Sequence, residues 1–367
     1  MLILYITYID FDSQASGSGM RPQRMYRAFL EEGHQVKLLS CQQGTPKTRG
    51  PREKAVAEIS RWLDTNRPDI CYVESPVYPI LWRSDRDLIR KIHRMGIPMG
   101  YFYRDFYRKF PKQFPHRPGF ANGVKDTVLD VLQRVTDRTL ENMDIVYFPA
   151  QESFRLFDYR DMRALPPGGE DHLACSVPEE RRCIYVGGVL NQYAGEMMLE
   201  AFALLNAGEE RWPLTLVCRE KEWDRIPDRL KGADWLELHH ASGEELVPLL
   251  SRAAAGLLIG KKDETYSYFD YSYSIKLFEY LGYGLPVVYV HNSPMDRFVT
   301  ENGMGIGVDC TPESFALGIR ELFADRERWA RFRENARNTL VSGNTWTHRV
   351  RQVVRELGEI GERKEGD

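Results

Sequence analysis

The chain has 367 residues and 43% hydrophobic residues, which is enough for two α/β domains of ordinary size. Its formal net charge of -3 lacks the basic footprint of a nucleic-acid-binding protein, so we expect no nucleic-acid partner. No apolar run reaches the ~20 residues that a membrane-spanning helix needs, and Asp10 and Asp12 come too early for a signal peptide.

The six cysteines include no C-x-x-C pair, and several fall within apolar runs typical of strands. We interpret them as reduced thiols of the core, which indicates a reducing compartment. The expected location is therefore the cytoplasm, with attachment to the inner face of a membrane as a further option.

The first half of the chain predicts a doubly wound α/β domain. A strand at 2–9, a glycine-rich loop at 10–19, a helix at 22–32 and a strand at 35–40 form a βαβ unit. Further strands are expected at 69–73, 97–103 and 144–148. We predict a Rossmann-like domain over residues 1–165.

The loop after the first strand reads Gly17-Ser18-Gly19-Met20-Arg21-Pro22. It lies at the carboxyl edge of the predicted sheet, where α/β proteins bind ligands. It differs from the dinucleotide-binding G-x-G-x-x-G because Pro22 replaces the third glycine, and the second strand ends without an acid for a ribose. These differences argue against an NAD-dependent enzyme. An ordinary strand-to-helix turn is the alternative.

Basic and aromatic residues gather in the stretch 101–120, which begins at the end of a predicted strand. Arg104 and Asp105 fall at the carboxyl end of that strand, where a local salt bridge worth under ~1 kcal/mol is the simpler explanation. The remaining cations and phenylalanines could contact an anionic bilayer or a lipid-linked acceptor. A half-buried loop that lines the ligand site explains them equally well.

A turn-rich segment at 165–178 marks a domain boundary, and the βαβ pattern then repeats. The second domain is expected to contain strands 183–186, 214–218, 235–238 and 256–259, a Gly187-Gly188 loop, a helix at 196–205 and a helix capped by Ser242 and Glu245. We predict a second Rossmann-like domain over 166–344. A last helix at 345–357 should end at Gly358, leaving a charged tail to residue 367.

We expect no metal site. His239 and His240 are adjacent in a predicted strand, so their side chains point to opposite faces and do not share an ion easily. No third ligand is spaced to help them.

The stretch 271–290 combines a loop, a short helix, a glycine stop and a buried strand. Ser274 is a candidate N-cap, and the helix begins with Ile275 and Lys276. A cation in the first turn opposes the helix dipole, but it would suit a bound phosphate. Glu279 lies one turn further on the same face. We therefore expect this face to hold a phosphate and a sugar hydroxyl, while a surface helix with an i,i+3 ion pair is the ordinary alternative.

The residues Lys276-Leu-Phe-Glu279-Tyr280-Leu-Gly-Tyr-Gly284-Leu-Pro286-Val-Val resemble the K-x-x-E-Y/A-x-x-x-G-x-P-V-V signature of GT-B glycosyltransferases, above all the retaining enzymes of glycosyltransferase family 4. The resemblance implies two Rossmann-like domains that face a central cleft, with the segment 345–367 crossing back to the first domain. It also implies a UDP- or GDP-sugar donor, a glycan or lipid-linked glycan acceptor, no tightly bound cofactor and no strict need for a divalent metal.

The resemblance also implies roles for individual residues. The residue matching Glu279 binds the donor ribose, and the helix N-terminus at Ser274, Ile275 and Lys276 holds the diphosphate. The diphosphate is also approached by the loop of Gly17, Ser18 and Gly19, with Arg21 as an added charge. Asp105 falls where the family often has a contact to the transferred sugar.

Two departures from the family pattern stand out. Gly187-Gly188 occupies the place of a family Gly-Arg, and Tyr193 falls near the place of a family lysine. We expect Arg219, Lys261 or Lys262 to substitute for the missing cations. Tyr271 also replaces the first of the family's paired acids, which we interpret as a difference in donor specificity.

We therefore predict a glycosyltransferase that moves a sugar from a nucleotide-diphosphate donor to a hydroxyl acceptor with retention, in the synthesis of an envelope glycan or other polysaccharide. A GT-B epimerase would share the fold and the donor site. A non-catalytic GT-B subunit would explain the missing cations and the missing acid. Both alternatives stay open at this point.

Overall fold

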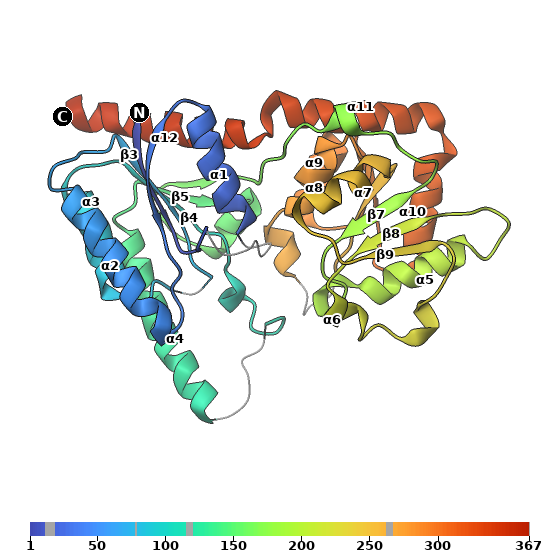
Figure 1. Ribbon diagram of the computed structural model, residues 1–367, viewed down its shortest axis with the longest axis horizontal. Helices are drawn as coiled ribbons and strands as arrows, with labels where there is room; N and C mark the ends of the chain where they lie inside the picture. The colour runs from blue at the N-terminus through green and yellow to red at the C-terminus, as the bar shows by residue number, and fades with distance from the viewer. Residues whose placement is uncertain (12–18, 78, 115–119, 262–266, 367) are drawn as a thin grey trace. The chain divides into compact units, whose positions relative to one another are not determined.

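The computed structural model describes residues 1–11, 19–77, 79–114, 120–261 and 267–366. The chain divides into two compact units: Met1–Pro166 together with Trp346–Asp367, and Pro167–Thr345. Each unit contains a parallel six-stranded sheet with flanking helices (Figure 1). The α/β class with two Rossmann-like sheets is thereby confirmed.

The first unit has its strands in the order β2-β1-β3-β4-β5-β6. Its strands are β1 (Leu2–Thr7), β2 (Gln35–Ser40), β3 (Ile70–Glu74), β4 (Met99–Phe102), β5 (Ile145–Phe148) and β6 (Met162–Ala164). Its helices are α1 (Met20–Glu31), α2 (Pro46–Trp62), α3 (Arg83–Arg94), η1 (Tyr107–Lys109), α4 (Phe120–Leu140), η2 (Gln151–Leu156) and α12 (Trp346–Gly366).

Helices α1 and α12 share one face of this sheet, and α2, α3 and α4 lie on the other (Figure 1). Because both faces are covered, β3, β4 and β5 are buried along their whole length, and their sequences are apolar except for Glu74 at the end of β3. Phe29 of α1 and Val353 and Leu357 of α12 enter one core cluster with Tyr72 of β3. The C-terminal helix is therefore part of the first unit's core.

The predicted stop at Gly358 is wrong, because α12 continues to Gly366. Ile360 is buried beyond the expected stop, so the apolar face of the helix continues to pack against the core. Glycine inside a helix costs roughly 1 kcal/mol relative to alanine, which this burial offsets. The charged tail that we expected is mostly helix.

The second unit has its strands in the order β12-β11-β10-β7-β8-β9. Its strands are β7 (Cys183–Val186), β8 (Leu214–Val217), β9 (Leu236–His239), β10 (Ala255–Leu258), β11 (Val287–Val290) and β12 (Gly305–Val308). Its α-helices are α5 (Gly195–Leu205), α6 (Glu220–Trp223), α7 (Leu246–Arg252), α8 (Ile275–Gly282), α9 (Ser293–Glu301), α10 (Pro312–Ala324) and α11 (Arg326–Gly343). Its 3-10 turns are η3 (Leu173–Cys175), η4 (Asn191–Tyr193), η5 (Asp228–Leu230), η6 (Gly243–Glu245) and η7 (Tyr268–Tyr271).

Helix α8 packs so closely against the segment at 169–170 that the glycines at the contact have no room for a side chain. A Cβ added at Gly169 would lie 2.2 Å from the carbonyl oxygen of Phe278, and one added at Gly282 would lie 2.1 Å from that of Glu170. Gly284 has a φ of +64°, the left-handed conformation that ends many helices. The position of α8 relative to the segment at 169–170 is thereby fixed.

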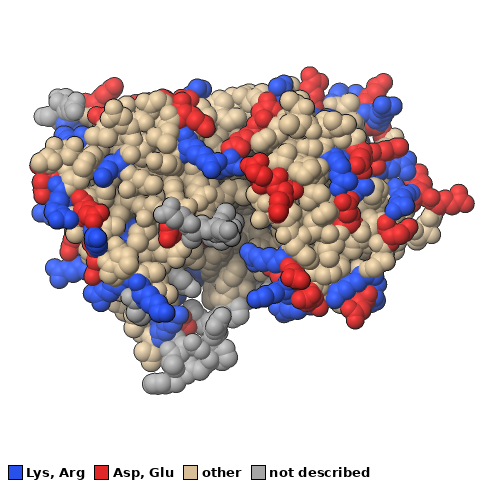
Figure 2. All heavy atoms as spheres, in the orientation of Figure 1, with Lys and Arg blue, Asp and Glu red and all other residues tan. Residues whose placement is uncertain are grey.

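The surface and the thiols add two observations. Acidic and basic side chains are interspersed over the face of each unit that Figure 2 shows. None of the helices in the described ranges is both long and apolar enough to cross a membrane. Cys71, Cys183 and Cys218 are buried as expected, whereas Cys175 is exposed and is not a core thiol.

Candidate functional site

The second unit has a switch in strand order at β7. Chain connections run from β7 towards β8 and β9 on one side, while β10, β11 and β12 lie on the other. Open α/β sheets bind ligands at the carboxyl ends of their strands at such a point. The loop that leaves β7 begins with Gly187 and Gly188. The Gly187-Gly188 loop therefore lies where this topology favours a ligand.

Lys276, in the first turn of α8, reaches this loop. Its Nζ donates a hydrogen bond of 3.4 Å to the Oη of Tyr185 on β7. The same nitrogen lies 4.9 Å from the ring centroid of Tyr185 and 5.2 Å from that of Tyr193. Two aromatic rings thus contact the ammonium group, an arrangement that attracts a cation.

The electrostatic surroundings leave this ammonium incompletely compensated. Burial lowers the pKa of Lys276 to about 8, and the carboxylates of Glu279 and Glu222 act in the opposite direction. Burial dominates because loss of water disfavours the charged form. An anionic ligand would supply the missing stabilisation, so this lysine suits a phosphate group.

Gly187 and Gly188 make the approach of Lys276 possible. A Cβ at Gly187 would lie 2.4 Å from the Cε and 2.6 Å from the Nζ of Lys276. A Cβ at Gly188 would lie 2.6 Å from the ring of Tyr193. Gly187 also has a φ of +144°, which disfavours any other residue. A side chain at position 187 would displace the end of the Lys276 side chain, and the backbone conformation there favours glycine.

The other predicted donor residues of this unit lie in or near α8 and the β7 loop. Ser274 is the N-cap of α8, but its side chain makes no capping hydrogen bond. Ile275 begins the helix, and Glu279 is half-buried one turn beyond it. Because the first N–H groups of a helix have no partner within it, the start of α8 offers donors to an anion.

We expected Arg219, Lys261 or Lys262 to substitute for the missing family cations. The surroundings of Arg219 and Lys261 differ from those of Lys276. The Arg219 side chain is 81% exposed and pairs with Glu222 at 3.0 Å. Glu222 in turn accepts a hydrogen bond from the backbone N–H of Val189 in the β7 loop. The backbone N–H of Lys261 donates to the carbonyl of Gln192. Lys262 lies outside the described residues, and Lys276 is a cation that the described part of the chain brings to Gly187.

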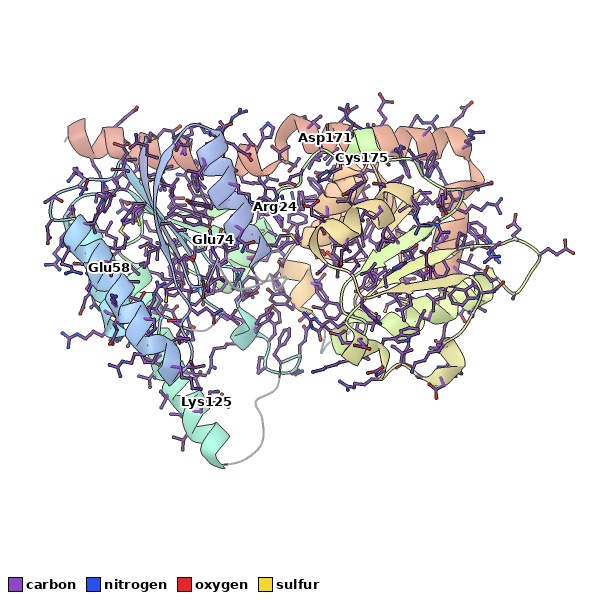
Figure 3. The ribbon with its side chains drawn as sticks, in the orientation of Figure 1. Arg24, Glu58, Glu74, Lys125, Asp171 and Cys175 are labelled. Atoms are coloured by element: carbon purple, nitrogen blue, oxygen red, sulfur yellow. The ribbon has the colours of Figure 1, made fainter. Side chains whose placement is uncertain are left out.

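In the first unit, Gly19 is the residue before α1, whereas Gly17 and Ser18 lie outside the described residues. Arg21 does not take the place we expected. Arg21 is 2% exposed, and its guanidinium pairs with Glu74 at 3.1 Å and lies 3.6 Å above the ring of Phe102. Glu74, labelled in Figure 3, is the last residue of β3. Arg21 is a core cation, and this geometry gives no support to a diphosphate contact.

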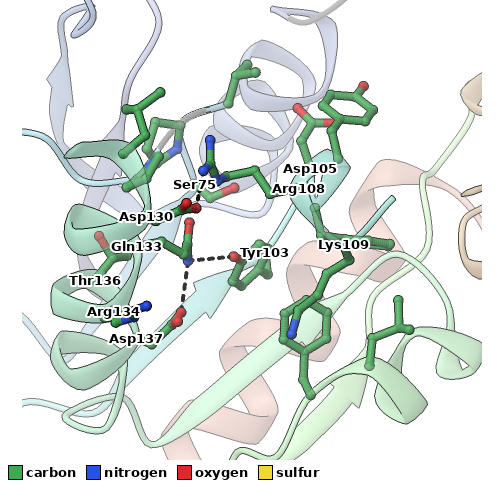
Figure 4. Close-up of a pocket in the computed structure, with 18 of the residues that line it drawn as sticks. Ser75, Tyr103, Asp105, Arg108, Lys109, Asp130, Gln133, Arg134, Thr136 and Asp137 are labelled. Atoms are coloured by element: carbon green, nitrogen blue, oxygen red, sulfur yellow. Dashed lines mark hydrogen bonds and ion pairs between the residues drawn. The ribbon is translucent and has the colours of Figure 1, made fainter. Parts of the chain in front are cut away.

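A pocket of about 1190 Å³ lies in the first unit, between α4 and the segments that follow β3, β4 and β5 (Figure 4). Asp105 lies on its wall and pairs with Arg104 at 2.9 Å, the local salt bridge that was the simpler expectation. Its wall includes the aromatic residues Tyr101, Tyr103, Phe106, Tyr107, Phe114, Phe157 and Tyr159.

A polar network crosses one side of the pocket. Gln133 of α4 donates from Nε2 to the Oη of Tyr103 and to the Oδ1 of Asp137, each at 2.9 Å (Figure 4). The hydroxyl of Tyr159 donates to the same Asp137 oxygen at 3.0 Å. Sequence reasoning indicated the side of this pocket formed by Asp105 and the 101–120 stretch but missed the side formed by α4. The signal for that side was the pair Gln133 and Asp137, spaced four apart on one face of a helix.

The described part of the 101–120 stretch turns inward. Phe106 and Phe110 are buried, and the ring of Tyr107 packs at a tilt against that of Phe114, with ring centroids 4.5 Å apart. Lys109 lies 4.9 Å above the ring of Phe157. These contacts match the half-buried loop that we considered alongside a membrane contact.

The two histidines have separate partners. His239 Nε2 lies 2.8 Å from a carboxylate oxygen of Glu237, and His240 Nδ1 lies 2.7 Å from the carbonyl of Cys218. Over the described ranges, no group of three or more His, Cys, Asp and Glu side chains is placed to hold a metal ion.

Comparison with known proteins agrees with this architecture. A family model described as glycosyl transferase-like matches residues 197–355, less than half of the chain. Sucrose-phosphate synthase from Thermosynechococcus elongatus superposes with a TM-score of 0.67 at 12% identity, over 99% of this chain and 100% of that one. No curated protein matches the sequence.

Two further solved structures share the fold. WaaG, a glycosyltransferase involved in lipopolysaccharide biosynthesis, has a TM-score of 0.65 at 14% identity, over 96% of this chain and 99% of that one. Anabaena Alr3699/HepE, solved in complex with UDP, has a TM-score of 0.65 at 12% identity, over 98% and 100%. The chain therefore has the GT-B fold, and the match over residues 197–355 supports a transferase of the glycosyltransferase group 1 type.

Proposed function

We propose that this protein is a glycosyltransferase that uses a UDP- or GDP-sugar and transfers the sugar to a hydroxyl acceptor with retention. The observation that carries the proposal is the meeting of Lys276 with the Gly187-Gly188 loop at the switch point of the second sheet. The resemblance of residues 276–288 to family 4 supports the retaining stereochemistry. The family match and the fold support the transferase class.

The proposed chemistry follows from where charge develops. When the bond between the sugar and the diphosphate breaks, negative charge grows on the diphosphate, and fixed positive groups stabilise it. The ammonium of Lys276 and the N–H groups at the start of α8 supply that potential. A divalent metal is then not strictly needed. Glu279, one turn along the same helix, would accept hydrogen bonds from the ribose hydroxyls.

The acceptor is assigned to the pocket of the first unit. Aromatic walls with a few converging polar groups suit a hydroxylated ring. Gln133, Asp137 and Tyr159 offer both donors and acceptors, and Asp105 lies on the same wall. A glycan or lipid-linked glycan fits this chemistry. Replacing Gln133 by Leu should raise the KM for the acceptor while donor hydrolysis keeps its rate.

A peripheral membrane contact would accompany a lipid-linked acceptor. The exposed face of α4 carries Val124, Val128 and Val131, each about half exposed and spaced i, i+4 and i+7. Lys109 and Lys112 are exposed on the neighbouring 101–120 stretch, and Lys125 lies in α4 (Figure 3). Apolar residues flanked by cations favour an anionic bilayer. Co-sedimentation with phosphatidylglycerol vesicles, lost on Val128→Glu, tests this contact.

Thermal unfolding with a panel of ligands tests the proposal. The panel contains UDP, GDP, their common sugar conjugates and NAD. A ligand that binds only the folded protein adds roughly 2.7 kcal/mol of stability at a hundred times its dissociation constant. We expect one nucleotide to raise the midpoint and Glu279→Ala to remove that shift. A shift with NAD alone, or with no sugar nucleotide, contradicts the proposal.

Assays of turnover and nucleotide binding on the same purified protein distinguish the transferase from the alternative functions. A GT-B epimerase would convert its sugar nucleotide when no acceptor is present. A non-catalytic subunit would bind nucleotide weakly and turn over no donor. We favour the transferase because three solved structures with this fold are described as a sucrose-phosphate synthase, a glycosyltransferase and a trehalose 6-phosphate synthase.

A further inference from the structure

We propose that the pocket of the first unit binds an acceptor that carries a protonated amine beside its hydroxyl groups, and that the carboxylate of Asp137 is the partner of that amine. The inference rests on the proposed function and deepens it, because it names the class of acceptor as an amino sugar. The observation that carries it is a carboxylate without a cationic partner in an aromatic pocket.

The carboxylate of Asp137 is only partly satisfied by the chain. It is half-buried in the last turn of α4 and lines the pocket (Figure 4). Its Oδ1 accepts hydrogen bonds from Gln133 at 2.9 Å and from the hydroxyl of Tyr159 at 3.0 Å, and both donors are neutral. In the described part of the chain, no group donates to its Oδ2. A charge removed from water needs a partner, so this oxygen is available to a ligand.

The cations on the pocket wall do not neutralise Asp137. Arg108 pairs with Asp130 on an earlier turn of α4, and the ammonium of Lys109 lies 4.9 Å from the ring centroid of Phe157. Over the described ranges, no ion pair joins Asp137 to any of the basic residues that line the pocket, which are Arg108, Lys109, Lys125, Arg134 and Arg155. The negative charge of Asp137 is therefore left for a ligand cation.

The place of Asp137 on α4 adds negative potential. The C-terminal end of a helix carries a partial negative charge, which disfavours a carboxylate there. Glu141 lies four residues further along the pocket wall, and like charges at this spacing repel each other. Burial raises the pKa of the Tyr159 hydroxyl, and the charges of Asp137 and Glu141 raise it further. Arg138, the basic residue of the last turn, does not line the pocket. A bound cation would relieve this concentration of negative charge.

Aromatic rings complete a site for an ammonium group. Tyr103, Phe157 and Tyr159 line the pocket and contact one another, because the centroid of Phe157 lies 4.9 Å from that of Tyr103 and 6.0 Å from that of Tyr159. The faces of such rings attract cations. The chain itself uses one of them in this way, since the Lys109 ammonium lies over Phe157. A carboxylate among aromatic rings suits an amine and repels a phosphate.

The amine orients the acceptor and does not react. A protonated amine has no lone pair, so a hydroxyl of the same molecule stays the nucleophile. The hydroxyl of Tyr103 accepts from Gln133 and keeps its own proton for an acceptor oxygen. The cavity of about 1190 Å³ exceeds the ~300–1,000 Å³ of most small-molecule sites, so it has room for more than one sugar ring.

Calorimetric binding to the whole protein tests the proposal. The ligands are methyl glucosides with an amine at carbon 2, 3, 4 or 6, each compared with its N-acetylated form. Acetylation keeps the ring and removes the charge. We expect at least one amine to bind roughly tenfold or more tightly than its acetylated form, the gain of a charged hydrogen bond. If no amine binds more tightly than its acetylated form, the inference is overturned.

Asp137→Asn removes the charge and keeps the shape of the side chain and an acceptor oxygen for Gln133 and Tyr159. The ratio between the affinities for the amine and for its acetylated form should fall to about one. Asp158→Asn is the matched control, because it removes the same charge from an exposed position of the pocket wall, where water screens it. It should change the ratio less than about twofold. Equal losses in the two variants would overturn the role of Asp137.

Lys109→Met should act in the opposite direction. It removes the ammonium of the chain from the ring of Phe157, so amine binding should tighten roughly threefold as the repulsion is lost. Lys112→Met, at an exposed position that does not line the pocket, should have no such effect. Weaker amine binding in Lys109→Met would contradict the inference, and this readout remains if Asp137→Asn fails to fold.

Turnover of sugar nucleotides by the same wild-type protein separates the two proposals. Turnover of a sugar nucleotide without a preference for any amine overturns this inference and leaves the proposed function standing. Binding of an amine without binding or turnover of any sugar nucleotide contradicts the proposed function instead.

Discussion

Lys276 and Arg21 are both cations in the first turn of a helix, and their surroundings give them different roles. Arg21 has a carboxylate and an aromatic ring within contact distance and is sealed from water. Lys276 is half-buried, contacts two tyrosine rings and has a lowered pKa. A buried cation that is already paired cannot leave its partner without a large cost, whereas an incompletely compensated cation is available to a ligand.

Nucleotide binding should depend on pH through Lys276. Its pKa of about 8 means that the ammonium is charged below that pH and neutral above it. Affinity for the diphosphate should therefore be constant below about pH 8 and fall up to roughly tenfold per unit above it. Bound anion raises the pKa of the lysine, so the complex takes up protons.

Calorimetry across this pH range measures the effect, and Lys276→Arg is the control. The guanidinium stays protonated throughout, so residual binding by this variant should not change with pH. A wild-type affinity that is flat through pH 8 contradicts the role given to Lys276.

Arg21→Met should destabilise the protein by about 3–5 kcal/mol, because it leaves Glu74 buried without its cation. Urea unfolding measures this loss, and Arg27→Met, at an exposed position of the same helix, should change little. Nucleotide binding by the folded Arg21 variant should match the wild type. Unchanged stability with weakened nucleotide binding would instead restore the phosphate role that the sequence suggested for Arg21.

At the scale of single elements, the N-cap of α8 differs from those of α9, α10 and α11, each of which has a side-chain cap. The side chain of Thr311 accepts a hydrogen bond from the N–H of Ser314 at the start of α10, whereas Ser274 makes no such bond on α8. A helix start without a side-chain cap leaves its N–H groups to water or to a ligand.

Thr311→Ala should therefore lower the free energy of unfolding by about 1 kcal/mol, and Ser274→Ala by less than about half of that. The two substitutions remove the same kind of group from equivalent positions, so each serves as the control for the other. Equal losses in urea unfolding would show that Ser274 caps α8 in solution.

Where glycine or proline bounds a strand, the first and last residues of the strand could be predicted from the sequence. The apolar runs 183–186 and 287–290 are β7 and β11 as expected. Strand β6 was not predicted, because its three residues are only half-buried and include an arginine. The extent of α12 was also missed, since only packing against the core shows that the helix continues past Gly358.

At the scale of the whole molecule, the first unit is built from both ends of the chain. Helix α12 contributes Leu357, fully buried, to the core around β3 and α1. Leu357→Ala should cost about 2–5 kcal/mol of stability. Leu317→Ala, at a position 64% exposed on α10, is the matched control and should cost little. If Leu357→Ala unfolds at the wild-type urea concentration, α12 does not hold this core together.

The candidate site was predictable only where its residues are contiguous. Lys276 and Glu279 belong to one helix with a recognisable spacing, so the sequence indicated them. Tyr185 and Tyr193 lie more than eighty residues earlier and meet Lys276 only in the folded unit. The pocket likewise combines α4 with segments after three strands. These long-range contacts depend on the topology of the fold, which local sequence patterns do not specify.

The most direct test of the glycosyltransferase assignment is the release of UDP or GDP from a panel of sugar nucleotides, measured for the wild type, Lys276→Ala and Glu279→Ala. We predict that the wild type consumes one sugar nucleotide, and that both variants lose most of this turnover while keeping the wild-type unfolding midpoint. Loss of one fixed charge at a developing oxyanion typically costs on the order of a hundredfold in rate. Wild-type rates in both variants would contradict the account.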